Sequence, residues 1–280
     1  MYGRKLGMGL SSQFGLPLEE QVPLLREVGF EAFFCEWAPG ADVAPLGRAA
    51  DEYGMIFQSI HAPFVLMHSM WYRTEHTDTA LAQLLECVRV CAGNQVPMMV
   101  VHPFIGFTLH EPTPLGLANY ERVAKAARDL GVQIALENTE GEEYLAALMD
   151  HFKGWDNVGF CLDTGHELCY NRGKDMLALY GDRLIATHLN DNLGIRDCEG
   201  EITFLDDLHL LPFDGVADWE DIARRLNRCA YDGILSFELN TLSKPGRCEN
   251  DGYARMTTRE FFTAAYARAC RVAALAARCR

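Results

Sequence analysis

The sequence predicts an α/β fold, a single (β/α)₈ barrel that spans residues 1–280. Three observations support this prediction: eight short apolar runs recur along the chain, a segment of helical periodicity follows each run, and no linker-like or highly charged block interrupts the series. A barrel of this kind takes about 250 residues, so the 280 residues fit one barrel better than two domains. A doubly wound open sheet is the alternative fold.

The predicted strands are short apolar and β-branched runs, such as VGFCLD and MMVVH, and a polar residue follows or ends most of them. They are expected to end at Leu10, Glu36, His61, His102, Glu137, Asp163, His188 and Glu238. Seven of these eight ends are therefore His, Asp or Glu.

The predicted helices lie between the strands, and a glycine closes each of the first four just past its last apolar turn, which is a helix-stop signal. The helices are Leu18–Val28, Pro45–Tyr53, Thr77–Ala92, Pro114–Leu130, Glu142–His151, Lys174–Tyr180, Asp218–Ala230 and Thr257–Cys279. This alternation of strand and helix favours a barrel.

The composition, with 49% hydrophobic and 23% charged residues, is that of a globular protein. A formal net charge of −14 disfavours nucleic acid as a partner, because phosphate contacts need a basic surface, and favours a small molecule. No apolar run reaches the roughly 18 residues of a membrane span, so no membrane association is expected. The N-terminus lacks the apolar region of a signal peptide and the ten cysteines contain no CxxC pair, which favours a cytoplasmic protein with reduced thiols.

The polar strand ends predict a metal site. In (β/α)₈ enzymes the carboxyl ends of the strands and the loops that follow them converge on the active site. Carboxylates and imidazoles crowded at that end would repel one another or lose hydration unless a cation lay among them. A divalent metal ion is the simplest such cation.

The ordered strand-end motifs resemble those of the xylose-isomerase-like TIM barrel superfamily, which contains sugar isomerases and epimerases of the D-tagatose 3-epimerase type and, more distantly, nucleases of the endonuclease IV type. The resemblance covers essentially the whole chain. The motifs that carry it are SIHAPF, VVHPF, IALEN, GFCLDTGH, IATHLNDN, DLHLLPFDGVADW and LSFEL.

The epimerase branch of this superfamily implies one Mn²⁺, Mg²⁺, Co²⁺ or Zn²⁺ ion. By position its ligands would be Glu137, Asp163, His188 and Glu238. Three carboxylates and one imidazole suit a hard ion better than a thiolate site would. The resemblance further implies an isomerase or epimerase that removes a proton next to a carbonyl through an enediolate, with Glu137 and Glu238 as the acid and base.

The resemblance also implies substrate contacts. His166, in the D-T-G-H motif, is expected to bind a substrate oxygen, and Arg196 is a weaker candidate in the loop after His188. His61 and His102 either line the pocket or satisfy backbone groups at the strand ends. Two aromatic residues, Trp37 and Phe64, would wall a sugar pocket or pack in the core, and Asp191 makes a turn or supports the ligands from behind.

Two other activities remain as alternatives. An endonuclease IV-like phosphodiesterase would hold three zinc ions, and the chain has a positional candidate for each of the nine ligands of that family. These are Glu137, Asp163, His188 and Glu238 together with His61, His102, His166, Asp207 and His209. An inosose-type dehydratase would begin with the same proton abstraction. No Gly-rich phosphate loop follows a strand, so no nucleotide cofactor is expected, and association into a homo-oligomer is left open.

Overall fold

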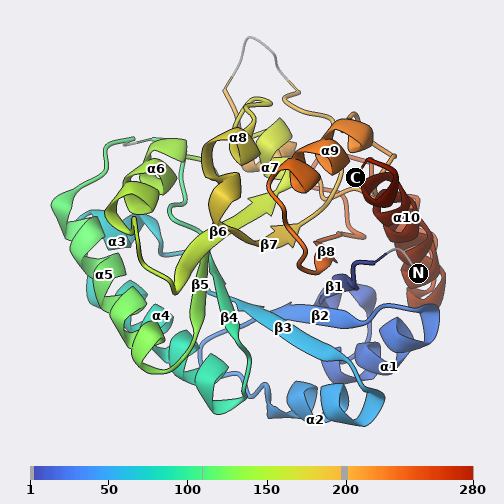
Figure 1. Ribbon diagram of the computed structural model, residues 1–280, viewed down its shortest axis with the longest axis horizontal. Helices are drawn as coiled ribbons and strands as arrows, with labels where there is room; N and C mark the ends of the chain where they lie inside the picture. The colour runs from blue at the N-terminus through green and yellow to red at the C-terminus, as the bar shows by residue number, and fades with distance from the viewer. Residues whose placement is uncertain (1–2, 109, 197–200, 280) are drawn as a thin grey trace.

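The computed structural model describes residues 3–108, 110–196 and 201–279. Its eight parallel strands form one curved sheet in the order β7-β6-β5-β4-β3-β2-β1-β8, and helices surround the sheet (Figure 1). The strands are β1 Leu6–Leu10, β2 Ala32–Glu36, β3 Ile56–His61, β4 Met98–Val101, β5 Gln133–Glu137, β6 Val158–Asp163, β7 Leu184–His188 and β8 Leu235–Phe237. Leu189 pairs in parallel with Phe237 and joins β7 to β8, which confirms the predicted (β/α)₈ barrel.

All eight predicted helices are present within one or two residues of their expected ends. They are α1 Leu18–Val28, α2 Ala44–Tyr53, α4 Thr77–Gly93, α5 Pro114–Asp129, α6 Glu142–His151, α8 Met176–Tyr180, α9 Trp219–Arg228 and α10 Thr258–Arg278. Two short helices in the loops after strands, α3 His68–Trp71 and α7 Thr164–Leu168, were not expected, because neither is long enough to show a periodic pattern. None of the described helices has the length and apolar character that a membrane crossing requires.

Alternation along the strands separates two apolar layers. Residues that face outward pack under the helices in the main core, whereas a small inner cluster fills the barrel. The inner cluster is Met98, Val100, Ala135, Cys161 and Ala186. Two residues after the last four of these come His102, Glu137, Asp163 and His188, so the same alternation that fills the barrel turns these four polar side chains toward its mouth.

A long loop joins β7 to α9, and one buried carboxylate organises its described part. Asp191 accepts hydrogen bonds from the backbone N–H of Phe213 at 2.8 Å and of Ala217 at 3.0 Å, and from the indole N–H of Trp219 at 2.9 Å. Its backbone also pairs with Leu210 in an antiparallel bridge. The neighbouring His209 has a left-handed backbone (φ 50°), so this loop is fixed in a specific conformation rather than simply spanning the gap.

Candidate metal centre

A cavity of about 440 Å³ opens at the carboxyl ends of the strands. Most of its lining residues are polar and come from strand ends and loops, and three are phenylalanines. The lining residues are Gln13, Glu36, His61, Phe64, His102, Ile105, Gly106, Phe107, Glu140, His166, Tyr170, Phe204, Asp207, His209, Glu238, Asn240 and Lys244. The cavity is therefore a polar, partly acidic pocket at the place where barrel enzymes carry their active sites.

Four strand-end residues meet next to this cavity; Glu238 lines it, and the other three are buried behind the lining residues. Glu137, Asp163, His188 and Glu238 each offer one ligand atom, and these atoms all lie within 4.8 Å of one another. They come from four consecutive strands of the chain, β5 to β8, with Glu238 one residue beyond the end of β8. The structure thus brings together the four residues that the sequence suggested as ligands of one ion.

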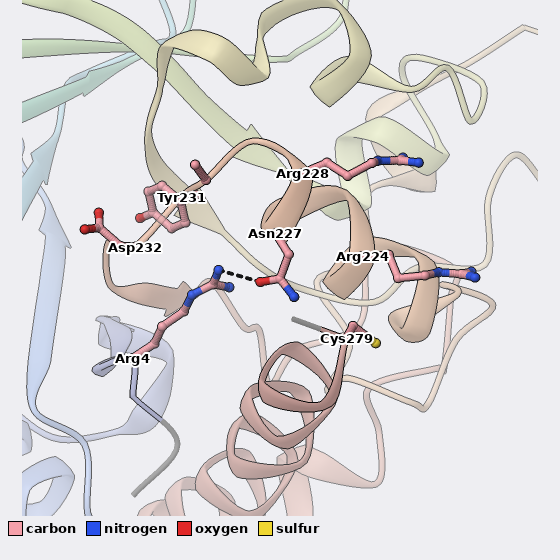
Figure 2. A pocket seen from close by; sticks show the side chains of 8 residues that line it. Arg4, Arg224, Asn227, Arg228, Tyr231, Asp232 and Cys279 are labelled. Atoms are coloured by element: carbon pink, nitrogen blue, oxygen red, sulfur yellow. Dashed lines mark hydrogen bonds between the residues drawn. The ribbon is translucent and has the colours of Figure 1, made fainter.

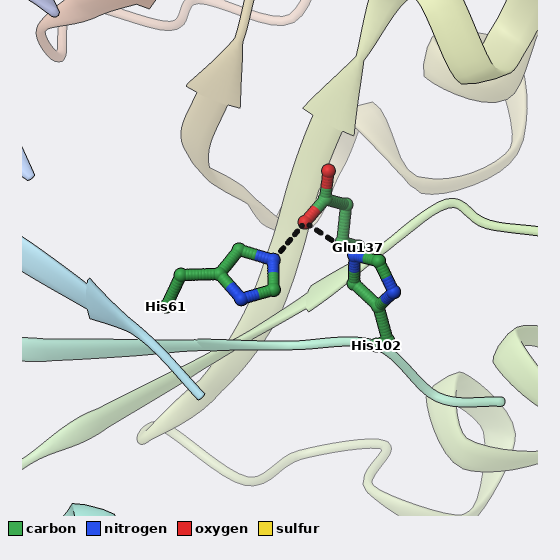
Figure 3. A group of neighbouring side chains, drawn as sticks. All are labelled: His61, His102 and Glu137. Atoms are coloured by element: carbon green, nitrogen blue, oxygen red, sulfur yellow. Dashed lines mark ion pairs between the residues drawn. The ribbon is translucent and has the colours of Figure 1, made fainter. Parts of the chain in front are cut away.

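Two further groups adjoin the first. His61, His102 and Glu137 form one of them, and His166, Asp207 and His209 form the other, each with ligand atoms within 4.8 Å. Figure 3 shows the rings of His61 and His102 turned toward the same carboxylate oxygen of Glu137. The structure therefore places all nine candidate ligands in three adjoining groups, two of which share Glu137.

Glu137 lies at the centre of these groups. Glu137 is fully buried, and its Oε2 is 3.3 Å from Nε2 of His61 and 3.5 Å from Nε2 of His102, yet this oxygen atom makes no hydrogen bond to a described residue. Its Oε1 is 3.3 Å from Nδ1 of His188 and 3.5 Å from Nδ1 of His166. A buried carboxylate oxygen without a donor is costly, and spacings of this kind fit ligands arranged around a cation.

Three histidines each make a hydrogen bond from one ring nitrogen to a main-chain carbonyl oxygen. Nδ1 of His61 lies 2.9 Å from the carbonyl oxygen of Ala62, and Nδ1 of His166 lies 3.0 Å from that of Asn138. Nδ1 of His209 is likewise 3.2 Å from the carbonyl oxygen of Glu238. A carbonyl can only accept, so each Nδ1 carries a proton, and Nε2 is the ring nitrogen that faces the site. Metal-binding histidines usually show this arrangement.

The comparisons with known proteins agree with this architecture. The family model described as xylose isomerase-like TIM barrel matches residues 22–259, which is most of the chain. The chain belongs to the xylose isomerase-like TIM barrel family. A relative at 28% identity, which covers 79% of this chain and 80% of its own length, is the uncharacterized protein y4fM of Sinorhizobium fredii (strain NBRC 101917 / NGR234).

Solved structures share the family's fold with this chain at low identity. An IolI protein with a bound zinc atom superposes with a TM-score of 0.76 at 17% identity, over 96% of this chain and 98% of that one. D-psicose 3-epimerase from Clostridium cellulolyticum H10, solved with D-tagatose, gives 0.72 at 16% identity over 96% and 99% of the two chains. An L-ribulose 3-epimerase gives 0.69 at 17% identity over 98% and 96%. At these identities the likeness establishes the fold.

The electrostatics of the site in this family member favour a positive charge. Burial by itself lowers the pKa of His209, but Asp207 and Glu238 outweigh it and raise that pKa to about 9. Burial by itself raises the pKa of Glu238. The neighbouring His188 and His209 outweigh burial and lower this pKa to about 2, so the carboxylate is ionised at neutral pH. Burial is the largest influence on Asp163 and raises its pKa to about 6. The site thus holds carboxylates whose field attracts protons or a metal ion.

A thiol lies beneath the four-residue group. Cys161 has its sulfur within 4.8 Å of ligand atoms of Glu137 and His188. Burial and the neighbouring carboxylates raise the pKa of this thiol well above its usual value, so it is protonated at neutral pH. The donor atoms of the four-residue group are therefore mostly carboxylate oxygens, without a thiolate beside them.

Two residues predicted to bind substrate lie outside the cavity. Trp37 is buried in the main core, and its indole N–H donates to the carbonyl oxygen of Ala41 at 3.0 Å. Because successive strand residues face opposite sides and Glu36 faces the cavity, Trp37 has to turn away from it. Arg196 is exposed beyond the Gly194 turn and is not among the described residues that line the cavity.

Other cavity residues had no signal in the sequence. Tyr170 stacks on the ring of His166, with centroids 4.8 Å apart, and Glu140 accepts a hydrogen bond from the backbone N–H of Gly106 at 2.9 Å. Lys244 and Asn240 lie in the loop after β8. Each belongs to a loop or a short helix, where no periodicity or spacing rule indicates which way a side chain points. Phe64, suggested as a pocket wall, does line the cavity.

A larger cavity of about 690 Å³ lies at the opposite, amino-terminal end of the barrel. Figure 2 shows Arg4 reaching toward Asn227, to which it donates a hydrogen bond of 2.8 Å, while Arg224 and Arg228 point away from Arg4. Its described lining holds a single carboxylate, Asp232, and no histidine. The donor chemistry of a metal centre is found at the mouth instead.

Proposed function

We propose that this chain is a divalent-metal-dependent isomerase or epimerase, acting on a sugar, a sugar phosphate or a related keto-polyol. The observation that carries the proposal is the meeting of Glu137, Asp163, His188 and Glu238 within 4.8 Å next to a polar cavity. The names of the D-psicose and L-ribulose 3-epimerases, which share the fold, support a reaction of this class. Mn²⁺, Mg²⁺, Co²⁺ and Zn²⁺ all suit the donor set.

A bound divalent ion would supply a Lewis acid that makes the C–H bond next to a substrate carbonyl more acidic. Glu238 lines the cavity and is ionised at neutral pH, so it enters the reaction as the base that removes this proton. Glu137, the other glutamate of the group, is also ionised at rest, because His188, His102 and His61 outweigh burial and hold its pKa well below the usual value. It therefore first takes up a proton from solvent and then returns that proton to the enediolate. Protonated His166 donates a hydrogen bond to a substrate oxygen, because Asp163 and Asp207 outweigh burial and raise its pKa well above the usual value.

Exchange with heavy water tests the proposed reaction directly. We expect metal-loaded protein in D₂O to introduce deuterium at the carbon next to the carbonyl of at least one ketose or keto-inositol, because enediolate formation exposes that carbon to solvent-derived protons. Nuclear magnetic resonance would follow the exchange. Chelation should stop it and Mn²⁺ should restore it. Metal-loaded protein that exchanges no member of a panel of ketohexoses, their phosphates and keto-inositols would contradict the proposal.

A second candidate is a phosphodiesterase with three metal ions. The observation that favours it is the orientation of His61, His166 and His209, whose Nε2 atoms all face carboxylates of the site. Four carboxylates and three Zn²⁺ ions would leave a net positive centre, which suits a phosphate anion. The net charge of −14 counts against a nucleic-acid substrate.

Metal stoichiometry separates the two candidates. We expect about one divalent ion per chain, measured by elemental analysis on protein purified without an immobilised-metal column, if only the four-residue group is a permanent site. The variant His209→Asn should then leave the metal content unchanged. About three zinc ions per chain, falling in His209→Asn, would shift the assignment to phosphodiester hydrolysis.

A further inference from the structure

Apart from its histidines, the charged side chains that line the cavity at the mouth are carboxylates, with one exception. Four of its lining residues are carboxylates, and Lys244 is the one lysine or arginine on the part of its wall that the structure describes. The carboxylates are Glu36, Glu140, Asp207 and Glu238. A neutral polyol gains little from a cation at this wall, whereas an ionised group that approaches these carboxylates is stabilised by a positive charge beside them.

Lys244 reaches over Asp207 toward the cavity. Its Nζ lies 3.3 Å from Oδ2 of Asp207, and its side chain is 23% exposed. Asp207 is already compensated from the other side, since Nε2 of His209 lies 2.9 Å from its Oδ1 and Nε2 of His166 lies 3.5 Å away. An ammonium has three donors, so Lys244 can hold a second acceptor while it keeps this contact.

The loop that carries Lys244 is tied to the loop that carries Asp207. The side chain of Asn250 donates to the carbonyl oxygens of Leu208 at 3.1 Å and Asn240 at 2.8 Å. The backbone N–H of Asn240 donates to the carbonyl oxygen of His209 at 3.1 Å. The cation is thus held at a fixed place beside the candidate ligands, which lowers the entropic cost of binding through it.

We propose that Lys244 forms a subsite for an ionised group of the substrate, a phosphate or a carboxylate, at the edge of the cavity. This inference rests on the proposed function only in taking the mouth cavity as the substrate site. The substrate class is then an anionic sugar or polyol derivative rather than a neutral sugar. Lys244 selects such a substrate through a charge-assisted hydrogen bond and is a specificity-determining residue, not an acid or base.

Calorimetric titration with three small probes tests the subsite. The probes are glycerol, glycerol 3-phosphate and glycerate, which share a polyol frame and differ in the ionised group. We expect Lys244→Met in the metal-loaded protein to weaken binding of one or both anions about ten- to a hundredfold, as the loss of a charge-assisted hydrogen bond implies, and to leave binding of glycerol unchanged. Lys244→Arg, which keeps the charge, should retain most of the affinity. The anion that loses affinity identifies phosphate or carboxylate as the recognised group.

The matched control is Lys153→Met, which removes an exposed lysine from the loop before β6, at the other end of the barrel, and should bind every probe as the wild type does. Equal affinities of Lys244→Met and the wild type for both anions, or no binding of either anion to the wild type, would overturn the proposal. Binding needs no turnover, so this result is independent of the deuterium exchange that tests the isomerase assignment.

Discussion

Glu137→Gln is expected to reduce turnover by about 10³-fold or more and to lower the metal content of the protein. Removing a positioned acid or base costs about 10²- to 10⁴-fold in rate, and this carboxylate also faces four histidines and belongs to two candidate ligand groups. The neutral amide keeps the shape of the side chain but loses the charge that a dication needs. Steady-state rates and elemental analysis of the same preparation measure both effects.

The comparison variants for Glu137 separate its roles. Glu238→Gln should lose turnover to a similar extent, because this residue lines the cavity and is the proposed base. Glu121→Gln makes the same chemical change on α5, where Glu121 pairs with Lys125 and His151 far from the mouth, and should retain full activity. A wild-type rate in Glu137→Gln or Glu238→Gln would remove that residue from the mechanism.

Arg225→Leu is expected to lower the free energy of unfolding by about 3–5 kcal/mol, the cost of leaving a buried charge without its partner. Arg225 is buried on α9 and forms two hydrogen bonds, of 2.7 and 3.0 Å, to the buried carboxylate of Glu167 on α7. Burial raises the pKa of Glu167 even with Arg225 beside it. The loss should therefore shrink as the pH falls, because protonated Glu167 is cheaper to bury. Urea denaturation at two pH values measures both effects.

Arg224→Leu provides the control for this prediction. Arg224 precedes Arg225 on the same helix, is largely exposed and lies 3.4 Å from Asp221, so its loss should cost no more than about 1 kcal/mol. A double variant, Glu167→Leu with Arg225→Leu, should recover part of the stability, since it removes the unpaired charge as well. Equal losses of unfolding free energy in Arg224→Leu and Arg225→Leu would show that burial of the Arg225–Glu167 pair does not determine its contribution to stability.

The strand-end residues could be predicted from the sequence because the barrel imposes a simple rule. Parallel strands end at one mouth, and alternation fixes which side of a strand each residue faces. Glu137, Asp163 and His188 follow inner-core residues by two positions, so their convergence needed no knowledge of the loops. The same rule decides between the two alternatives for Trp37 in favour of core packing, since its neighbour Glu36 occupies the inward position.

The loop residues could not be predicted in the same way. Lys244 and Tyr170 reach the cavity from a loop and a short helix end, whose paths depend on particular hydrogen bonds. Asn250, for example, fixes the loop of Lys244 through two main-chain carbonyls, and an asparagine in a loop carries no sign of such partners. The resemblance to the superfamily suggested Asp207 and His209 as ligands for the three-zinc alternative. It did not indicate the loop conformation that brings these two residues to His166.

The loop that Asp191 organises supplies part of the site separately from the barrel strands. Asp207 and His209 both lie on it, whereas the four residues that meet next to the cavity come from the barrel itself. Shortening or redirecting this one segment would remove two of the nine candidate ligands at once and leave the other seven in place. The number of metal ions that the mouth can hold therefore depends on the path of a single insertion, whereas the barrel strands alone determine the inner ligands.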